Sequence, residues 1–193
     1  ISQNDIQTTL AFNNGLSLLT LTKQELVAVL EHGVAGLPGV AGQFAQVSGV
    51  LYSFDPDLDA GSRIVNAGIF TKDGTLVAEL VRDGEIVGDQ TQEFRVVTLG
   101  FMAAGGDNYP FPDLTLDRVN HVDLEELAAG ATTGDATFAA DGTEQDALAE
   151  YLLEYHNTEA TAYALEDVGR DSDLRIQNLN YQEDTVWDGI WYS

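Results

Sequence analysis

Apolar and polar positions follow two different periods in the first part of the chain. Residues 16–21 form an almost continuous apolar run, which predicts a buried strand. Thr22 and Glu25 come next, at the spacing of a helix capping box. The apolar residues after them recur at helical spacing: Leu26, Val27, Val29, Leu30 and Val34. The pattern therefore predicts a strand that leads directly into a capped helix.

From residue 44 to residue 99 the period is that of β-structure. The segments rich in β-branched and aromatic residues, which we predict to be strands, are 47–54, 63–70, 76–81, 85–87 and 94–99. Asp73-Gly74 and Asp83-Gly84 separate three of them, and Asp-Gly between apolar runs is a strong hairpin signal.

The second half of the chain has weaker patterning. Residues 113–142 contain one short helical stretch near 123–129 and otherwise small polar residues. Thr143 begins a clear helix, whose predicted apolar face consists of Ala147, Leu148, Tyr151, Leu152 and Tyr155. Residues 174–179 are expected to form a closing strand. These elements predict one α+β domain with a central mixed β-sheet flanked by helices.

Composition narrows the possible functions. Apolar residues make up 44% of the 193 residues, enough for a packed core, and no apolar run approaches the length of a membrane-spanning helix. Eight basic residues against 32 acidic ones give a net charge of −24, which disfavours nucleic acid as a partner. The chain has no cysteine, so disulfides, thiol catalysis and thiolate metal sites are excluded.

The sequence contains no motif of a catalytic centre. The three histidines, His32, His121 and His156, are far apart, and none has a partner at the spacing of a metal site. His32 falls in the last turn of the predicted helix, where a capping or surface role is expected. We therefore predict no catalytic residue and no metal ligand in this chain.

One acidic segment resembles the start of a calcium loop. It reads Asp55-Pro56-Asp57-Leu58-Asp59, but Ala60 stands at the position of the required glycine and Asn66 at that of the bidentate glutamate. A solvated connection between strands is the favoured interpretation.

A glycine pair after the last predicted strand of the β-rich region is more informative. In Gly105-Gly106-Asp107, the glycines allow a tight turn and close approach of a ligand. The carboxylate after them can accept two hydrogen bonds from a vicinal diol such as ribose. Phe101 is expected at the mouth of this turn. An ordinary loop can have the same pattern, so the turn alone does not establish a site.

Five segments in one order carry a resemblance to a known family. They are Ala11-Phe12-Asn13-Asn14, residues 21–26, residues 42–49, Gly61-Ser62-Arg63 and residues 101–109. Together they resemble the C-terminal domain of the 5'-nucleotidase family, which includes bacterial UDP-sugar hydrolases and animal ecto-5'-nucleotidase. The resemblance implies that residues 1–193 form one substrate-binding domain, in which residues 113–142 are an insertion that we cannot place.

The resemblance also implies binding roles for five residues. Two phenylalanines sandwich the nucleobase in the family, and they match Phe12 and Phe101, with core packing as the alternative for both. The aspartate that holds the ribose hydroxyls matches Asp107. Asn14 matches a base-edge contact of bacterial members, and Gly42 matches a glycine that lines the pocket.

Some features of the family are missing or altered. Asn108 stands where many family members carry glycine, and Asn13 where some do, a difference that can alter loop geometry. The arginines that contact substrate and the N-terminal metallophosphatase domain, with two divalent metal ions that activate water, are expected upstream of Ile1. The chain itself is expected to need no cofactor.

The resemblance implies the substrate-recognition domain of a secreted, metal-dependent 5'-nucleotidase, extracellular or periplasmic. Its ligand would be a nucleotide or nucleoside, and its partner in cis the metallophosphatase domain. The isolated chain is then expected to be inactive as a phosphatase. Two alternatives stay open: a non-catalytic binding or structural module of a large exported protein, and a salt-adapted or calcium-dependent surface domain.

Overall fold

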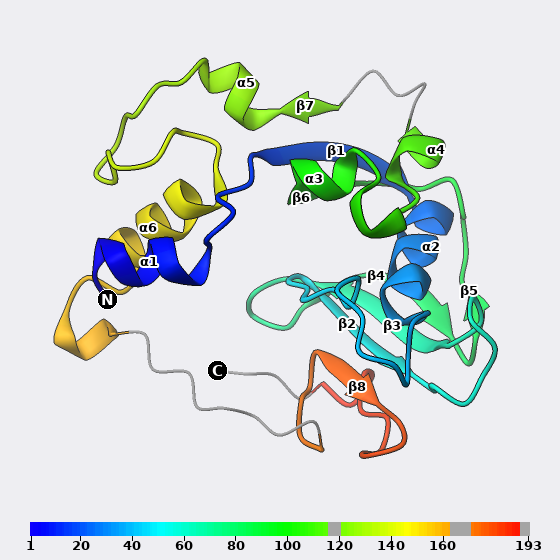
Figure 1. The fold of residues 1–193 in the computed structure, drawn as a ribbon. Coiled ribbons are helices and arrows are strands. Elements are labelled where there is room, and N and C mark those ends of the chain that lie inside the picture. The colour runs from blue at the N-terminus through cyan, green and yellow to red at the C-terminus, as the bar shows by residue number, and fades with distance from the viewer. Residues whose placement is uncertain (116–120, 163–170, 190–193) are drawn as a thin grey trace. The chain divides into compact units, whose positions relative to one another are not determined.

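The computed structural model describes residues 1–115, 121–162 and 171–189, and within them the chain packs as two compact units (Figure 1). The first unit takes Ile1–Thr20, Arg95–Gly106 and Phe111–Glu166. The second takes Leu21–Phe94, Asp107–Pro110 and Asp167–Ser193. The chain therefore crosses between units several times.

A five-stranded sheet forms the centre of the second unit. Its order is β5-β4-β3-β2-β8. The strands are β2 (Val50–Phe54), β3 (Ile64–Phe70), β4 (Leu76–Arg82), β5 (Glu85–Ile86) and β8 (Ile176–Asn178). β2 and β8 pair in parallel, whereas the other neighbours are antiparallel, so the sheet is mixed. The predicted α+β architecture with a mixed sheet is confirmed.

Helix α2 (Lys23–Val34) packs against β3 and β4 of this sheet. Its predicted start is confirmed, because the Thr22 hydroxyl accepts from the backbone N–H of Glu25 and the Glu25 carboxylate accepts from that of Thr22. Near the other end of the helix, the buried Glu31 carboxylate accepts the backbone N–H groups of Arg63 and Ile64, at 2.9 and 2.8 Å. This side chain ties the helix to the first residues of β3.

A smaller sheet with the order β6-β1-β7 belongs mainly to the first unit. Its strands are β1 (Leu16–Thr22), β6 (Glu93–Leu99) and β7 (Val122–Asp123), and the sheet is accompanied by the short helices α3 (Gly100–Ala103), α4 (Phe111–Thr115) and α5 (Leu124–Ala128). β7 comes from the predicted insertion and pairs antiparallel with β1. The insertion therefore adds an edge strand to a sheet formed by the preceding part of the chain.

Two helices pack against each other elsewhere in this unit. They are α1 (Gln3–Thr9) and α6 (Glu144–Tyr155), which lie side by side (Figure 1). Ile6 of α1 and Ala149 of α6 form a buried cluster with Ala136, which precedes α6 in the chain. The predicted apolar face of α6 was partly wrong: Leu148 and Leu152 pack against this cluster, whereas Tyr151 and Tyr155 are exposed and Gln145 and Asp146 are buried.

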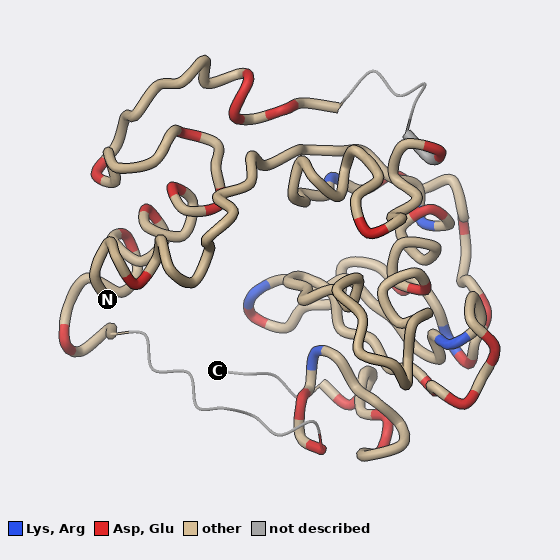
Figure 2. Tube along the Cα trace, in the orientation of Figure 1, with Lys and Arg blue, Asp and Glu red and all other residues tan. Residues whose placement is uncertain are grey.

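Acidic residues are spread over the whole trace, whereas basic residues are few (Figure 2). Two of the cations are buried. Lys23 is 4% exposed and its ammonium donates to the carbonyl oxygen of Val87, and Arg63 is 8% exposed. The Arg63 guanidinium donates to three backbone carbonyls, those of Val34, Ala35 and Leu58. Both charged groups therefore satisfy backbone carbonyls inside the second unit and do not lie on its surface.

The helices within the described residues are all too short or too polar to span a membrane.

Candidate functional site

The Gly-Gly-Asp turn follows directly on β6 and α3. Gly105 has φ 90°, and Asp107 and Asn108 have φ 51° and 58°, so three of four successive residues are in the left-handed region. The segment Gly106–Asn108 is a short turn whose central residue, Asp107, has left-handed and not helical backbone angles. Glycine tolerates this conformation freely and asparagine and aspartate tolerate it better than other residues, which explains the composition of the turn.

The family resemblance implies glycine in many members at position 108 and in some at position 13, and asparagine fits the backbone found there. Asn108 and Asn13 both have positive φ, 58° and 47°. A left-handed backbone is the conformation for which glycine is usually selected. The two substitutions are therefore compatible with the left-handed loops at these positions.

The backbone of Asp107 is held by a small network in the second unit. The Nε2 of His32 lies 2.9 Å from the Asp107 carbonyl oxygen. The His32 ring packs edge-on against Tyr109, with ring centroids 4.6 Å apart. The Tyr109 hydroxyl donates to the carbonyl oxygen of Gln43 at 2.6 Å, and the Gln43 amide donates to the carbonyl of His32. Tyr109 and Gln43 thus hold the backbone of the next residue in the network, and the bond from His32 to Asp107 holds the turn.

Burial of Tyr109 fits this supporting role. The pKa of its hydroxyl is raised to about 12, first by burial and second by the negative charge of Asp107. The hydroxyl therefore stays protonated at neutral pH and keeps its bond to Gln43.

Gly42 lies beside the carboxylate of Asp107. A methyl group at Gly42 would lie 3.4 Å from Asp107 Oδ2. The glycine therefore leaves the carboxylate open on that side, and the structure brings these two predicted site residues together in the second unit.

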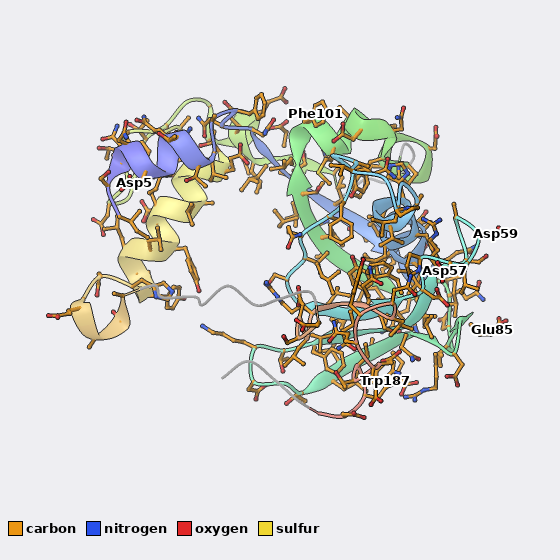
Figure 3. The ribbon with its side chains drawn as sticks, turned by 60° about the horizontal axis from the view of Figure 1, so that its bottom comes forward. Asp5, Asp57, Asp59, Glu85, Phe101 and Trp187 are labelled. Atoms are coloured by element: carbon orange, nitrogen blue, oxygen red, sulfur yellow. The ribbon has the colours of Figure 1, made fainter. Side chains whose placement is uncertain are left out.

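The predicted aromatic residues both belong to the first unit, and neither is part of a core. Phe12 is 90% exposed and Phe101 is 52% exposed. Figure 3 labels Phe101. Core packing, the alternative interpretation for these two residues, is thus excluded. The Phe101 ring packs against Gly106, because a methyl group there would lie only 2.4 Å from ring carbons.

The chain segments that carry the first-unit residues meet at one end of the β6-β1-β7 sheet. The backbone N–H of Gly100, just before Phe101, donates to the carbonyl oxygen of Gly15, just after Asn14, at 2.7 Å. Asn14 in turn donates its backbone N–H and its amide nitrogen to Glu144, at 2.7 and 3.1 Å. Both bonds leave the amide oxygen Oδ1 of Asn14 outside the contact with Glu144.

The sequence did not predict the hydrogen bonds that hold the Gly-Gly-Asp turn. His32 lies in the last turn of α2 as predicted, but its contact with the backbone of Asp107 was not predicted. Gln43 and Tyr109 belong to the segments that carried the family resemblance, so they were noticed without a role. No local signal links His32 to a residue 75 positions away.

Within residues 1–115, 121–162 and 171–189, no three His, Cys, Asp or Glu residues are grouped in a way that could hold a metal ion. In the suspected calcium loop, the Asp55 carboxylate accepts the backbone N–H of Asp57, which is an ordinary turn.

Comparison with known proteins decides the family. The sequence model described as "5'-nucleotidase, C-terminal domain" matches residues 1–113, more than half of the chain. The chain belongs to the family of 5'-nucleotidase C-terminal domains. The match ends where the predicted insertion begins.

Relatives of known sequence and structure agree with this assignment. The trifunctional nucleotide phosphoesterase YfkN of Bacillus subtilis is 31% identical over 109 residues, which are 56% of this chain and 7% of that protein. The crystal structure of a 5'-nucleotidase precursor from Thermus thermophilus is 28% identical with a TM-score of 0.66 and covers 93% of this chain and 28% of its own. The NAD nucleotidase of Haemophilus influenzae, 18% identical, has a TM-score of 0.64 over 95% of this chain and 27% of its own, and shows the fold alone. The chain thus spans less than a third of each of these proteins.

Proposed function

We propose that this chain recognises the nucleoside part of a nucleotide for a metal-dependent 5'-nucleotidase. The observation that carries the proposal is the Gly-Gly-Asp turn, in which Asp107 is held in a left-handed conformation while its neighbour Gly106 packs on the exposed ring of Phe101. Family membership supports a nucleotide as the class of substrate.

The aromatic rings would contribute affinity without strict selectivity. A nucleobase stacked on Phe12 and Phe101 would cover apolar surface that water now contacts, and stacking contributes about 1–3 kcal/mol per base. Every base has a flat face, so this contribution changes little from one base to another. An adenine amino group could in addition donate to Oδ1 of Asn14.

The carboxylate of Asp107 would recognise the sugar. Two vicinal hydroxyls can each donate to one carboxylate oxygen, and such charge-assisted bonds are stronger than neutral ones. Gly42 leaves room beside this carboxylate.

Cleavage of the phosphate would belong to another part of the parent protein. We propose an N-terminal metallophosphatase domain with two divalent metal ions as the partner in cis, a secreted parent, and residues 1–193 as the substrate-binding domain with 113–142 as an insertion. The proteins to which the chain is similar are several times longer than the matched region, which supports a multidomain parent.

Calorimetric titration of the 193-residue chain with adenosine tests the proposal. We expect Phe101→Ala to weaken binding roughly five- to a hundredfold, as loss of one stacking contact requires. Leu127→Ala, at an exposed apolar position on α5, is the matched control and should bind as the wild type does.

The sugar contact has its own probe. 2',3'-Dideoxyadenosine lacks both hydroxyls. Asp107→Asn should therefore weaken the binding of adenosine and leave the affinity for the dideoxy compound unchanged. Equal affinity of wild type and Phe101→Ala for adenosine would refute the stacking role. Metal-dependent phosphate release by the chain alone would refute the division of labour.

A further inference from the structure

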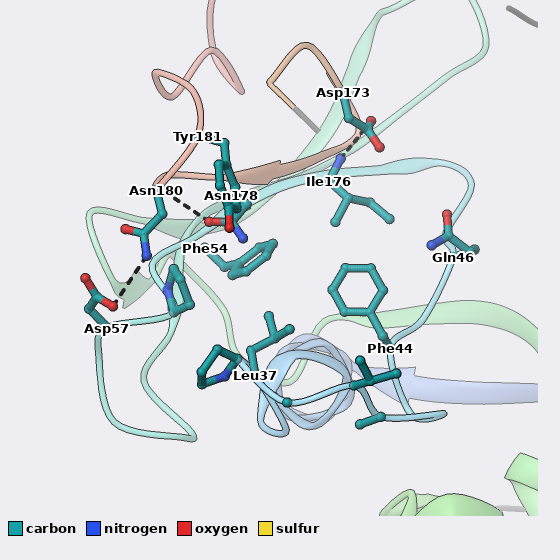
Figure 4. A pocket seen from close by; sticks show the side chains of 15 residues that line it. Leu37, Phe44, Gln46, Phe54, Asp57, Asp173, Ile176, Asn178, Asn180 and Tyr181 are labelled. Atoms are coloured by element: carbon teal, nitrogen blue, oxygen red, sulfur yellow. Dashed lines mark hydrogen bonds between the residues drawn. The ribbon is translucent and has the colours of Figure 1, made fainter. Parts of the chain in front are cut away.

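The second unit contains a cavity that none of the proposed nucleoside-binding residues lines. Its volume is about 460 Å³, within the range of small-molecule sites. It lies between the loop after α2, the ends of β2 and β8, and the segments around Pro56 and Tyr181 (Figure 4). All of its lining residues belong to one unit, so its shape is set within that unit.

The walls of the cavity are mainly apolar and aromatic. Phe44 and Phe54 meet edge to face, with centroids 6.2 Å apart and an angle of 66° between their planes (Figure 4). Phe54 is fully buried in β2, so it forms a fixed wall, while Phe44 is half-buried. Leu37 and Ile176 add aliphatic surface. Such walls suit a ligand with a flat or compact apolar body.

The charged groups of the cavity are all negative. Asp57 and Asp173 are its charged lining residues, accompanied by the amides of Gln46, Asn178 and Asn180, and among the residues that the structure describes no lysine, arginine or histidine lines it. Two carboxylates without a cation among the lining residues repel phosphate and carboxylate groups and attract amines. The cavity therefore does not suit a second nucleotide.

The two carboxylates are positioned by bonds that use one oxygen each. Asp173 Oδ1 accepts the backbone N–H groups of Arg175 and Ile176, at 2.8 and 3.3 Å. Asp57 Oδ1 accepts from the Asn180 amide at 3.4 Å. Figure 4 shows Asp57 and Asp173 at separate places around the phenyl rings. Oδ2 of each carboxylate can still accept a hydrogen bond, so an ammonium group could bind at Asp57 or at Asp173.

We infer that this cavity binds a small organic cation, a primary amine carried on a ring-sized apolar body. The body fills the space against Phe44 and Phe54, and the ammonium donates to Asp173, or to Asp57. Asp173 is the stronger partner, because it is less exposed than Asp57 and is fixed by two backbone groups. This inference does not depend on the nucleoside-binding proposal.

Three related probes separate the contribution of the ring to binding from that of the ammonium group. Tryptamine carries both the ring and the ammonium, indole-3-acetate keeps the ring with the opposite charge, and ethylamine keeps the ammonium without the ring. In amide-resolved NMR titrations of the chain, we expect saturable shifts around the cavity with tryptamine alone. Saturable binding of indole-3-acetate at equal affinity, or no saturation by tryptamine at millimolar concentration, would overturn the inference.

Isosteric variants then locate the ammonium. Asp173→Asn should weaken the binding of tryptamine about tenfold, and Asp57→Asn about threefold. The difference is expected because the carboxylate of Asp173 is held by backbone groups, whereas that of Asp57 is exposed. Asp59→Asn is the matched control, because Asp59 is an exposed acid of the same loop that does not line the cavity. Equal weakening by Asp59→Asn would show general attraction to an acidic surface and overturn the site.

Phe44 tests the apolar wall. Phe44→Ala removes the ring. Phe44→Leu, which keeps an apolar side chain, replaces it in the test if the alanine variant does not fold, and a thermal melt of each variant shows which of them folds. We expect the folded variant to bind tryptamine at least fivefold more weakly than wild type, and unchanged affinity would contradict the proposed placement of the ring.

Discussion

The Nε2 atom of His32, in the last turn of α2, lies 2.9 Å from the backbone carbonyl oxygen of Asp107. A carbonyl oxygen can only accept, so this ring nitrogen carries a proton. The bond links the helix to a residue whose left-handed backbone is intrinsically unfavourable for a side chain with a Cβ atom.

We expect His32→Ala to lower the free energy of unfolding by about 1–2 kcal/mol, because the hydrogen bond and the ring contact with Tyr109 are both lost. Denaturant unfolding measures this change. Adenosine binding should weaken as well, since the turn that presents Asp107 loses its support. His32→Gln keeps an N–H donor and should restore much of the affinity. If His32→Ala binds adenosine normally while Asp107→Asn does not, the histidine has no part in presenting the carboxylate.

Gly106→Ala is expected to displace the Phe101 ring. The new methyl group would lie 2.4 Å from ring carbons, much closer than atoms can approach, and the ring is the part that can move. Adenosine affinity should therefore fall in calorimetry. In a Phe101→Ala background the same glycine substitution should cost nothing further, because the ring that it displaces is gone. An additive effect of the two substitutions would contradict the proposed contact.

The buried Asp146 of α6 should make stability depend on pH. Burial raises the pKa of its carboxyl, and the negative charges of Asp141 and Glu150 raise it further, whereas a backbone bond from Gly142 lowers it. The folded chain therefore binds this proton more tightly than the unfolded chain does. The resulting stability is complete below the unfolded pKa, about 4, and is lost as pH rises through the higher folded pKa.

Asp146→Asn tests this dependence. The variant should gain stability relative to wild type as pH rises from about 4 to 7, because it removes a charge that is costly to bury. Thermal melts across this range measure the difference, and Asp135→Asn, at an exposed acid of the same unit, serves as control. A difference that shrinks with rising pH would show that the carboxylate is stabilised and not destabilised by its surroundings.

Local patterns predicted the strand-to-helix step and the hairpins, because both depend on neighbouring residues. Thr22 and Glu25 form the predicted capping box, and the Asp83-Gly84 turn has the positive φ angles that such hairpins require. The short helix α1 was missed, although Ser2 and Asp5 form a capping box there as well. With a single buried residue, Ile6, it has almost no apolar period to detect.

The candidate site was predictable only as far as the family segments extended. They drew attention to Phe12, Phe101 and Asp107, and the exposure of both rings excludes a core role. The face of α6 was misjudged because its tyrosines were counted as apolar, whereas Gln145 is buried through its bond to the Leu10 carbonyl. Such long-range partners leave no trace in the local sequence.

The inward placement of Lys23 and Arg63 has a consequence for how copies of this domain behave in concentrated solution. Both cations bond to backbone carbonyls inside the second unit, so neither can pair with an acid on a neighbouring copy, and the net charge is −24. Neighbouring molecules will therefore repel one another in dilute buffer and remain dispersed. Close association between copies needs dissolved salt or multivalent counterions to screen the repulsion.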